Sequence, residues 1–436
     1  MGLGSFGGGA GCTRALVRLG AIVTVTDLRP ADALEESLES LAGLPITFVL
    51  GEHHSALFTE ADVVVVNPAV PSSSSWLEIA RRAGVTLTTE INLALALVPH
   101  LPAVAITGTH GKSTCAALCA HLLSGLPGKT LLAGNLGGSL LEQAMELGPE
   151  DRMVVELSSF QTERLVAPEA WPQIAILTSF GSDHLDRHGT LLAYAAAKRR
   201  LLDSQGQNDT LLLPAEGDEA QRWSESAHGK VERLDEHCLT ALGLTIADLP
   251  FSEPYRLPSV LAAIRAARLL GVDDVAMKVG LRGFSGLPHR MHAFTDSFGR
   301  AIVDNGVATH PEPTAEALKH MAGPVVLLAG GKDKGLDLEE LSRTCSPCAR
   351  LYLYGQGGQR LAEACRLQGQ DALVFEDCRS AMEAALKAWI PGETLLFSPS
   401  FSSYDEFRNF RDRARVFHSF CGSVPVDGIE GLSVFS

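Results

Sequence analysis

The stretch AVAITGTHGKSTCAALCAHLL, residues 103–123, decides how the middle of the chain folds. It opens with small and β-branched residues that predict a strand, and it closes with an alanine-rich run that predicts a helix. Between the two lies Gly-Lys-Ser-Thr, residues 111–114. The common phosphate-loop spacing, G-x-x-x-x-G-K-[ST], would need a glycine where this chain has Ile106. The stretch is therefore either a phosphate loop of shorter pattern or a chance Gly-Lys-Ser in a turn.

The order of strand, glycine-containing loop and helix favours the phosphate loop. Glycines let backbone N–H groups face an anion, and the helix N-terminus adds its dipole. We expect Lys112 to reach the β- and γ-phosphates and Ser113 to offer its hydroxyl to Mg²⁺. The alternative is a plain turn with an exposed lysine. The predicted nucleotide loop consists of Gly108, Thr109, His110, Gly111, Lys112, Ser113 and Thr114.

The rest of the chain alternates strand-like apolar runs with helical patterns, which is typical of parallel α/β sheets. Breaks near residues 95–102 and 283–290 divide it. We predict three α/β domains: a Rossmann-like domain over 1–97, a central phosphate-loop ATPase-like parallel sheet over 98–286 and a Rossmann-like domain over 287–436. The predicted strands are 21–27, 46–51, 61–67, 85–90, 103–108, 153–159, 174–180, 210–216, 300–305, 324–331, 349–355, 372–377 and 393–400.

The charge and hydropathy of the chain exclude two classes of partner. Its formal net charge of -15 argues against nucleic-acid binding, which needs a basic face. No apolar run reaches the roughly 18–20 residues of a membrane span. The N-terminal MGLGSFGGG has neither the basic nor the apolar region of a secretion signal. We therefore expect a cytoplasmic protein without a membrane span.

The N-terminus carries a second glycine motif, Gly2-Leu-Gly4-Ser-Phe-Gly7. Asp27 follows Gly7 by 20 residues, as the acidic residue does in dinucleotide-binding folds. No strand precedes the motif, so either Met1 is an internal methionine of a longer product or the sheet lacks its first strand. A bare G-x-G-x-x-G leaves NAD and other nucleotides equally open.

Glu156, in VVELSSFQ, and His184, in GSDHLDRHG, both come just after predicted strands. Ligands of open parallel sheets bind at that edge, so these side chains and the Ser113 hydroxyl would suit Mg²⁺. Lys198 lies in the helical AYAAAKRRLL, where it is either part of this site or an ordinary solvated charge. We assign no functional role to His188.

Taken together, these stretches resemble the Mur ligases, the ATP-dependent amide-forming enzymes of peptidoglycan precursor synthesis. ITGTHGKST resembles the family's G-T-x-G-K-[ST] loop, which does without the first glycine. ELSSFQ (156–161), SDHLDRHG (182–189), Lys198 and GLPHR (286–290) follow in the family's order. LLAGGKDKGLDLEEL (327–341) and SPSFSSYDEFRNF (398–410) are similar to the branch that adds D-glutamate, and the D-N-P-R motif of the diaminopimelate-adding branch is absent.

The resemblance implies a substrate for each domain. The N-terminal domain would bind the UDP of UDP-N-acetylmuramoyl-L-alanine rather than NAD, and the C-terminal domain would bind D-glutamate. The implied UDP-substrate residues are Gly4, Ser5, Phe6, Asp27, Arg29, Asn67, Ser158, Ser159 and Gln161. The implied amino-acid residues are Thr309, Lys334, Ser403 and Phe410, and Asn135, Arg290 and Asp304 join the ATP site.

The reaction implied is ATP-dependent formation of an acyl phosphate followed by attack of the D-glutamate amine, in a monomer with ATP and two Mg²⁺ ions. Ser113 and Glu156 would hold one Mg²⁺. His184 and a carbamylated Lys198 would hold the second. Lys112, Glu156, His184 and Lys198 are thus the implied catalytic residues.

Two regions depart from the family pattern. Where the D-glutamate branch has N-D-S-K-A-T-N, this chain has Asp304-Asn-Gly-Val-Ala-Thr-His310, so Asn305 and Val307 replace an aspartate and a lysine. Ser259 stands for an asparagine near the adenine. These departures leave open another Mur-type or folylpolyglutamate-type ligase, or a non-catalytic nucleotide-binding paralogue. A dehydrogenase would explain only the first 30 residues.

Overall fold

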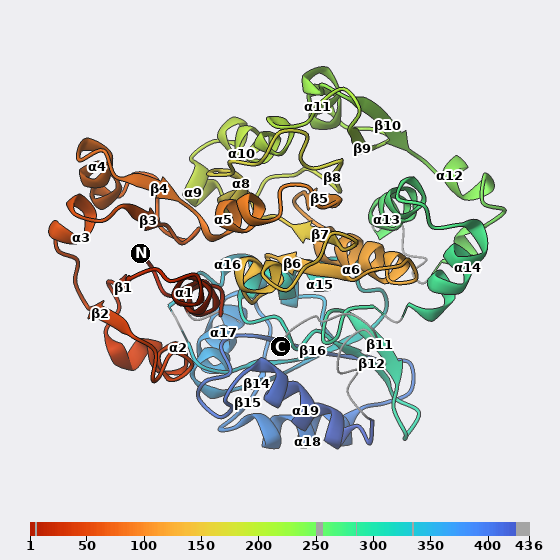
Figure 1. The fold of residues 1–436 in the computed structure, drawn as a ribbon. Helices are drawn as coiled ribbons and strands as arrows, with labels where there is room; N and C mark the ends of the chain where they lie inside the picture. The colour runs from red at the N-terminus through yellow and green to blue at the C-terminus, as the bar shows by residue number, and fades with distance from the viewer. Residues whose placement is uncertain (5–6, 250–255, 285, 334, 424–436) are drawn as a thin grey trace. The chain divides into compact units, whose positions relative to one another are not determined.

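The computed structural model describes residues 1–4, 7–249, 256–284, 286–333 and 335–423. The chain divides into two compact units, one spanning Met1–Phe284 and the other lying within Ser285–Ile429. Figure 1 colours the first unit from red to green and the second from teal to blue. Each unit is an α/β assembly, so the predicted fold class is confirmed.

The N-terminal part of the first unit holds two small parallel sheets. One pairs β1 (Val23–Asp27) with β2 (Ile46–Leu50), and the other pairs β3 (Val63–Val65) with β4 (Thr86–Thr88). The Gly2 N–H donates to the Thr26 carbonyl at 2.8 Å, and the Asn67 N–H donates to the Met1 carbonyl at 3.0 Å. The first residues of the chain therefore bond to the backbone at the carboxyl ends of both sheets, although they form no named strand.

The central part is a six-stranded parallel sheet with strand order β10-β9-β8-β5-β7-β6. Because β5 pairs with β7 on one side and β8 on the other, the chain reverses its direction of winding at β5. In open α/β sheets such a reversal leaves a crevice outside the carboxyl ends of the strands, where ligands bind. The strands are β5 (Ala103–Thr107), β6 (Thr130–Gly134), β7 (Arg152–Glu156), β8 (Ile174–Leu177), β9 (Thr210–Pro214) and β10 (Lys230–Leu234).

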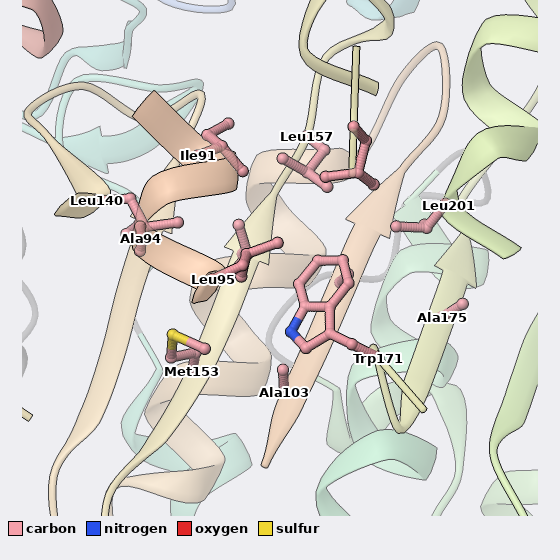
Figure 2. Packing of buried hydrophobic residues seen from close by; sticks show 14 of the residues in the cluster. Ile91, Ala94, Leu95, Ala103, Leu140, Met153, Leu157, Trp171, Ala175 and Leu201 are labelled. Atoms are coloured by element: carbon pink, nitrogen blue, oxygen red, sulfur yellow. The ribbon is translucent and has the colours of Figure 1, made fainter. Parts of the chain in front are cut away.

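Helix α5 (Glu90–Leu97) covers part of this sheet. Figure 2 shows how it directs Ile91, Ala94 and Leu95 onto the strands, beside the Trp171 indole. Each of these side chains is at most 3% exposed. Burying a large apolar side chain stabilises a fold by roughly 1.5–3 kcal/mol, so this cluster anchors the sheet that carries the phosphate loop.

Charged contacts add to that packing in the first unit. Arg14 on α1 (Gly8–Arg18) makes a two-pronged ion pair with Glu142 on α7 (Leu140–Ala144), with N–O distances of 2.7 and 2.8 Å. The N-terminal glycine segment is thereby held against the central part. The other helices of this unit are η1 (Ala31–Leu34), α2 (Glu35–Glu39), α3 (Ala56–Thr59), α4 (Ser75–Arg82), α6 (Lys112–Leu123), α8 (Ser159–Thr162), α9 (Leu185–His188), α10 (Leu191–Arg199), η2 (Arg200–Leu202), α11 (Asp218–Ser226), α12 (His237–Thr240), η3 (Ile246–Asp248), α13 (Leu257–Leu269) and α14 (Asp274–Gly283).

The second unit is a six-stranded sheet of order β11-β12-β16-β13-β14-β15, parallel except for the antiparallel edge pair β11–β12. Its strands are β11 (His292–Thr295), β12 (Ala301–Asp304), β13 (Val325–Gly330), β14 (Arg350–Tyr354), β15 (Leu373–Phe375) and β16 (Thr394–Ser400). Its helices are α15 (Pro311–His320), α16 (Glu339–Cys345), α17 (Gly355–Leu367), α18 (Cys378–Ala388) and α19 (Phe410–Phe420). In the part of the chain described here, no helix combines the length and the apolar character needed to cross a bilayer.

Candidate functional site

The loop between β5 and α6 has the backbone of an anion cradle. Gly111 caps α6 in a left-handed conformation with φ of 79°, and Gly108 has φ of 151°. A Cβ at Gly108 would lie 2.1 Å from the Thr178 hydroxyl oxygen, and one at Gly111 would lie 2.1 Å from the Ser259 hydroxyl oxygen. Ile106 is a fully buried residue within β5. The loop therefore begins at Gly108, after the position where the longer pattern would require a glycine.

Residues that follow β8 brace this loop. The Thr109 N–H donates to the Ser179 carbonyl at 3.0 Å, and the His110 N–H donates to the Ser179 hydroxyl at 2.8 Å. The Lys112 ammonium donates to the carbonyls of Gly108 and Thr109 at 3.0 and 2.8 Å. The lysine thus folds back over its own loop, at the helix N-terminus where an anion is favoured.

Glu156 ends β7 beside the loop and is 1% exposed. One of its carboxylate oxygens accepts a hydrogen bond from the Asn135 side-chain amide at 3.1 Å. The other, Oε2, is buried and has no hydrogen-bond partner within the described residues. An unpaired buried carboxylate oxygen is costly, and a hard cation such as Mg²⁺ takes oxygen ligands of this kind.

Lys198 is buried on α10, with 1% of its surface exposed, so the interpretation of a solvated charge is wrong. Its Nζ donates to the Gly108 carbonyl at 2.7 Å and lies 4.4 Å from the centre of the Tyr194 ring. Burial, followed by repulsion from Lys112, lowers the pKa of Lys198 to about 6. The amine is therefore largely neutral at pH 7 while it touches the phosphate loop.

His184 precedes α9 with φ of 51°, which is uncommon for a residue other than glycine. Its ring centre lies 4.9 Å from that of Phe160, and its side chain is 45% exposed beside Asp183. His188, to which the sequence assigned no role, lies with Nε2 3.0 Å from the Ser159 hydroxyl oxygen. Burial lowers the pKa of His188. The sequence signal that could have drawn attention to His188 is its position four residues after His184, in the same motif.

The ELSSFQ residues have a structural role of their own. Ser158 and Gln161 form a capping box at the start of α8: the Gln161 N–H donates to the Ser158 hydroxyl at 3.3 Å, and the Ser158 N–H donates to the Gln161 side-chain oxygen at 2.9 Å. Such a box satisfies N–H groups that the helix leaves unpaired. The predicted substrate residues therefore also fix the turn that follows Glu156.

In the N-terminal glycine segment, the Asp27 carboxylate accepts hydrogen bonds from the N–H groups of Leu3 and Gly4 at 2.8 and 3.4 Å and from Arg29. Burial alone would raise the pKa of Asp27, but the bonds to Arg29 and to the backbone lower it. Asn67 lies against the same segment: a Cβ on Gly4 would be 3.3 Å from its amide nitrogen. Gly4, Asp27, Arg29 and Asn67 thus gather at one turn. Ser5 and Phe6 lie outside the described residues.

In the second unit, the predicted amino-acid residues follow neighbouring strands. Thr309 follows β12, Ser403 follows β16, and Phe410 begins α19. The Ser400 N–H donates to the Ala308 carbonyl at 2.9 Å, which joins two of these segments. Lys334 lies outside the described residues. Arg290 is exposed just before β11.

Arg413 was not anticipated from the sequence. It is fully buried on α19, and its Nη1 donates to the carbonyls of Phe401 and Gly330 at 3.0 and 3.4 Å. Those carbonyls stand at the start of the two loops that lead to Ser403 and Lys334. The arginine therefore braces the segments that carry the predicted amino-acid residues.

The residues that depart from the family pattern face inward. Asp304 is fully buried, and its carboxylate accepts hydrogen bonds from His289 at 2.7 Å, from His418 at 2.9 Å and from the Gly306 N–H at 2.8 Å. Three hydrogen bonds within the unit thus engage its carboxylate, and the contact with ATP that the sequence assigned to Asp304 stays a prediction. Asn305 donates to the Ser398 hydroxyl at 2.9 Å inside the same core.

Family models match most of the chain. The MurD-like N-terminal domain of the Mur ligases matches residues 1–89, the Mur ligase middle domain matches 106–236, and the glutamate ligase domain of the Mur ligases matches 289–401. The chain belongs to the Mur ligase family. The predicted membership, the similarity to its D-glutamate-adding branch and the three-domain architecture are confirmed.

Named relatives of this Mur ligase agree with the family models. It is 35% identical over 449 residues to the UDP-N-acetylmuramoylalanine–D-glutamate ligase of Roseiflexus sp. (strain RS-1), with 96% of each chain covered. It is 34% identical over 432 residues to the enzyme of that name from Geobacter metallireducens, with 94% of each chain covered. The protein is therefore an enzyme, an ATP-dependent ligase of peptidoglycan synthesis, as the Mur ligases are.

Solved structures share the fold at low identity. The UDP-N-acetylmuramate–alanine ligase MurC of Thermotoga maritima aligns with a TM-score of 0.57 at 19% identity, covering 94% of this Mur ligase and 98% of that chain. The MurF ligase of the same organism, solved in complex with ADP, aligns with a TM-score of 0.54 at 15% identity, covering 85% and 96%. At such identities the alignments show a common architecture and leave the substrates to be argued from residues.

Proposed function

We propose that this Mur ligase joins the alanyl carboxylate of UDP-N-acetylmuramoyl-L-alanine to the amine of D-glutamate, with ATP forming an acyl phosphate first. The observation that carries the proposal is the edge of the central sheet: the loop Gly108–Ser113, the unpaired Glu156 oxygen and the buried Lys198 lie together there. A carboxylate is a poor acyl donor because oxide is a poor leaving group, so phosphorylation must precede amide formation.

In this proposal the phosphate loop positions ATP and neutralises charge. The loop N–H groups and Lys112 hold the β- and γ-phosphates, and the lysine exchanges its bonds to Gly108 and Thr109 for bonds to phosphate oxygens. The substrate carboxylate attacks the γ-phosphorus, and ADP leaves. Asn135, whose amide donates to Glu156, would orient the substrate carboxylate.

The donor atoms fit Mg²⁺ at two positions. The unpaired Glu156 oxygen and the Ser113 hydroxyl would hold one ion, and His184 with Lys198 would hold the other. Mg²⁺ would supply charge neutralisation on the phosphate oxygens as the γ-phosphoryl group is transferred. The proposed ATP site keeps Asn135, Arg290 and the loop residues, and no step of this proposal depends on Asp304, whose carboxylate accepts three hydrogen bonds inside the second unit.

Lys198 would offer Mg²⁺ oxygen donors only after conversion to a carbamate. Its pKa of about 6 leaves a neutral amine at pH 7, because burial disfavours the ammonium. The nitrogen lone pair attacks the carbon of CO₂, an N–C bond forms, one π pair moves to oxygen, and the nitrogen releases a proton to solvent. The product is a carbamate with hard oxygen donors, which suits Mg²⁺. The lysine thereby gains a negative charge beside the phosphate loop.

The two other substrates bind through different segments. The UDP portion lies at the N-terminal turn formed by Gly4 and Asn67, and Arg187 supports it by donating to the Val70 carbonyl at 2.9 Å. We assign D-glutamate to the segments that carry Thr309, Ser403 and Phe410, and Lys334 would pair with one of its carboxylates. A cavity of about 800 Å³ in the second unit is less suited to a dicarboxylate, since four acidic residues line it together with Lys332: Glu376, Asp377, Asp405 and Glu406.

Phosphate release with each substrate omitted in turn tests the proposal. We expect release only with ATP, Mg²⁺, UDP-N-acetylmuramoyl-L-alanine and D-glutamate together, and hydroxylamine should trap an acyl phosphate when D-glutamate is left out. Lys112→Ala should reduce release by roughly 10²–10³-fold, by analogy with the loss of one transition-state donor, while leaving UDP-substrate binding intact. Lys129→Ala, a matched change of a lysine outside this site, should be silent.

The same assay separates the alternatives. Stimulation by another amino acid instead of D-glutamate would assign the chain to a different Mur-type or folylpolyglutamate-type ligase. No turnover with any amino acid, in a protein that still binds ATP, would favour the non-catalytic paralogue. Retained activity in Lys112→Ala would contradict the phosphate-loop assignment.

A further inference from the structure

Two histidines and an aspartate from distant parts of the second unit meet in its interior. His289 precedes β11, Asp304 ends β12 and His418 lies near the end of α19. One carboxylate oxygen of Asp304 lies 2.7 Å from Nδ1 of His289 and 2.9 Å from Nε2 of His418. The three donor atoms all lie within 4.8 Å of one another. The proposed ligase reaction uses none of these contacts.

The cluster is enclosed and oriented by neighbours. His289, Asp304 and His418 are 5%, 0% and 2% exposed. The second oxygen of Asp304 accepts from the Gly306 N–H at 2.8 Å, and Nδ1 of His418 lies 2.9 Å from the Ser423 hydroxyl. Such partners fix the direction of a donor atom, as they do for the ligands of protein metal sites.

Aromatic rings wall the cluster. Phe294 stacks on His418 with ring centres 5.1 Å apart, and Phe417 lies edge-on to the same imidazole at 6.0 Å. A buried carboxylate in such surroundings needs a positive charge close by. Either the histidines supply it as imidazolium, or a metal ion does.

We propose that His289, Asp304 and His418 bind a divalent transition-metal ion of the zinc type. Imidazole nitrogens and a carboxylate oxygen are ligands that zinc, cobalt and nickel accept, and a set with two imidazoles among three donors favours these ions over Mg²⁺, which takes mainly oxygen ligands. Ligand atoms about 2.0–2.1 Å from a tetrahedral ion lie roughly 3.3 Å apart, so the two nitrogen–oxygen distances, 2.7 and 2.9 Å, need to widen by only about half an ångström. The site is therefore chemically distinct from the magnesium sites of the proposed reaction.

The carboxylate at position 304 is a departure of this chain from the family pattern. The family pattern N-D-S-K-A-T-N begins with asparagine, and Asp304 stands at that position here. A neutral amide would not balance a divalent ion, but a carboxylate does. The second histidine comes from α19, 114 residues later in the sequence. The ion would thus tie α19 to the end of β12.

The ion would also hold the segment that enters the second unit. His289 lies just beyond the end of the first unit at Phe284 and has φ of 56°. A side chain other than glycine in this conformation is strained, and binding through its imidazole would offset that cost. The ion would thus join the connecting segment, the sheet and the last helix of this unit, with three protein ligands and one open position.

Cobalt(II) binding to the full-length protein tests the site, because its visible absorption reports coordination directly. Protein stripped with EDTA and dialysed into chelator-free buffer is titrated with Co²⁺ in the presence of excess Mg²⁺. We expect about one equivalent to bind with a spectrum of nitrogen and oxygen ligands and no thiolate charge-transfer band. Zn²⁺ should displace the cobalt, and the bound ion should raise the melting temperature.

Variants assign the ion to these residues. Asp304→Asn and His418→Gln approximately keep the side-chain volume and should weaken cobalt binding by more than about tenfold. Even the loss of a residue that only hydrogen-bonds to a metal ligand typically lowers metal affinity by about 10–100-fold. His320→Gln is the matched control: His320 also pairs with a carboxylate, Glu316 at 2.8 Å, but on the surface of α15. It should bind cobalt as the unchanged protein does.

Each outcome decides the matter. Failure of the unchanged protein to bind cobalt or zinc would overturn the proposal and leave a hydrogen-bonded His–Asp–His cluster. A thiolate band would also overturn it, because the ion would then lie at buried cysteines such as Cys345 and Cys348. Undiminished cobalt binding in Asp304→Asn and His418→Gln would also overturn the proposal. Loss of cobalt binding in both variants, with binding retained in His320→Gln, would support it.

Discussion

The Nζ of Lys198 donates a hydrogen bond to the carbonyl of Gly108 over 2.7 Å, although the two residues are 90 positions apart in the chain. The contact joins α10 to the phosphate loop and buries an amine against a second one, Lys112, whose Nζ donates to the same carbonyl at 3.0 Å. Two amines that share one acceptor repel when both are charged. This repulsion, together with burial, disfavours the charged form of Lys198.

Lys198→Met should stabilise the ligand-free protein while it abolishes ligase activity. The folded-state pKa of Lys198, about 6, lies below its ordinary value of 10.5, so the unfolded chain binds more protons between these pH values. The loss of folding free energy caused by burying Lys198 is largest below about pH 6 and decreases as the pH rises toward 10.5. In CO₂-depleted buffer near pH 7 the gain should be on the order of a few kcal/mol.

Denaturant unfolding of both proteins from pH 6 to pH 10 measures this difference. The difference in the free energy of unfolding between Lys198→Met and the unchanged protein should decrease steadily as the pH rises. Lys230→Met, on the exposed edge strand β10, is the control and should show no such gap. A constant or widening gap would mean that the lysine is not held neutral in the folded state.

Gly111→Ala should damage the loop through two separate effects. The new Cβ would lie 2.1 Å from the Ser259 hydroxyl oxygen, and a φ of 79° is unfavourable for alanine. We expect a loss of roughly 1–3 kcal/mol in the free energy of unfolding and a rise in the KM for ATP. Ser259→Ala in the same protein should restore part of the loss, because only the collision is removed.

The matched measurement is a double-mutant cycle of unfolding free energies. Additive effects of Gly111→Ala and Ser259→Ala would show that the two residues do not interact. Gly20→Ala offers a comparison, since Gly20 has φ of 84° but a Cβ added there would meet nothing within 4 Å. It reports the cost of the backbone conformation alone.

The sequence predicted the strands that lead to the proposed active edge of the central sheet, because these strands are buried apolar runs. β5, β7 and β8 are buried almost throughout, so their apolar residues mark them, and Glu156 and the phosphate loop follow directly. The strands that the sequence did not predict, β6, β10 and β11, stand at sheet edges among the described strands. An edge strand pairs on one side only, so it can carry polar residues such as those of Lys230–Leu234 and give a weak pattern. β6 is different, because Thr130–Gly134 is a short apolar run that is buried almost throughout.

The environment of Asp304 could not be predicted from the sequence. Its partners His289 and His418 are 15 and 114 residues away, and only the packing of α19 brings them together. Asn305, the next residue, faces Ser398 instead. Neighbouring residues of a strand point to opposite sides of the sheet. The position of Asp304 and Asn305 in the sequence therefore does not tell which of these two side chains points toward a ligand. The same holds for Arg413, whose carbonyl partners are Gly330 at the end of β13 and Phe401 just after β16.

Asp304 should make the protein sensitive to acid. Burial alone would raise the pKa of Asp304, but the bonds from His289 and His418 hold it at about 2, below its ordinary value of 3.8. The carboxylate therefore contributes stability above about pH 4 that is lost as the pH falls toward 2, on the order of 2 kcal/mol. Asp304→Asn should be less stable at pH 7, and its unfolding should depend less on pH between 4 and 2.

Acid unfolding followed by circular dichroism checks this difference. Asp412→Asn serves as the comparison, because that carboxylate pairs with the surface side chains of Arg408 and Arg415. A change of the same size in Asp412→Asn and Asp304→Asn would show that general charge, rather than the histidine pair, sets the acid response.

Arg413→Met should raise the KM for D-glutamate by much more than the KM for ATP. The guanidinium is fully buried and bonds to the carbonyls of Phe401 and Gly330, which begin the loops leading to Ser403 and Lys334. Methionine keeps most of the stem packing but leaves both carbonyls without this donor, at a cost of about 1–3 kcal/mol each if they stay buried. The loops should then lose their fixed spacing and bind the amino acid less well.

Arg415→Met is the matched control, because Arg415 is exposed on the same helix and donates to Asp412 at 3.0 Å, so it should leave both constants unchanged. Steady-state kinetics at saturating UDP-substrate, with ATP and D-glutamate varied in turn, separates the two constants. An equal rise in both, or a fall in kcat alone, would mean that Arg413 supports the fold or the chemistry in general rather than the amino-acid loops.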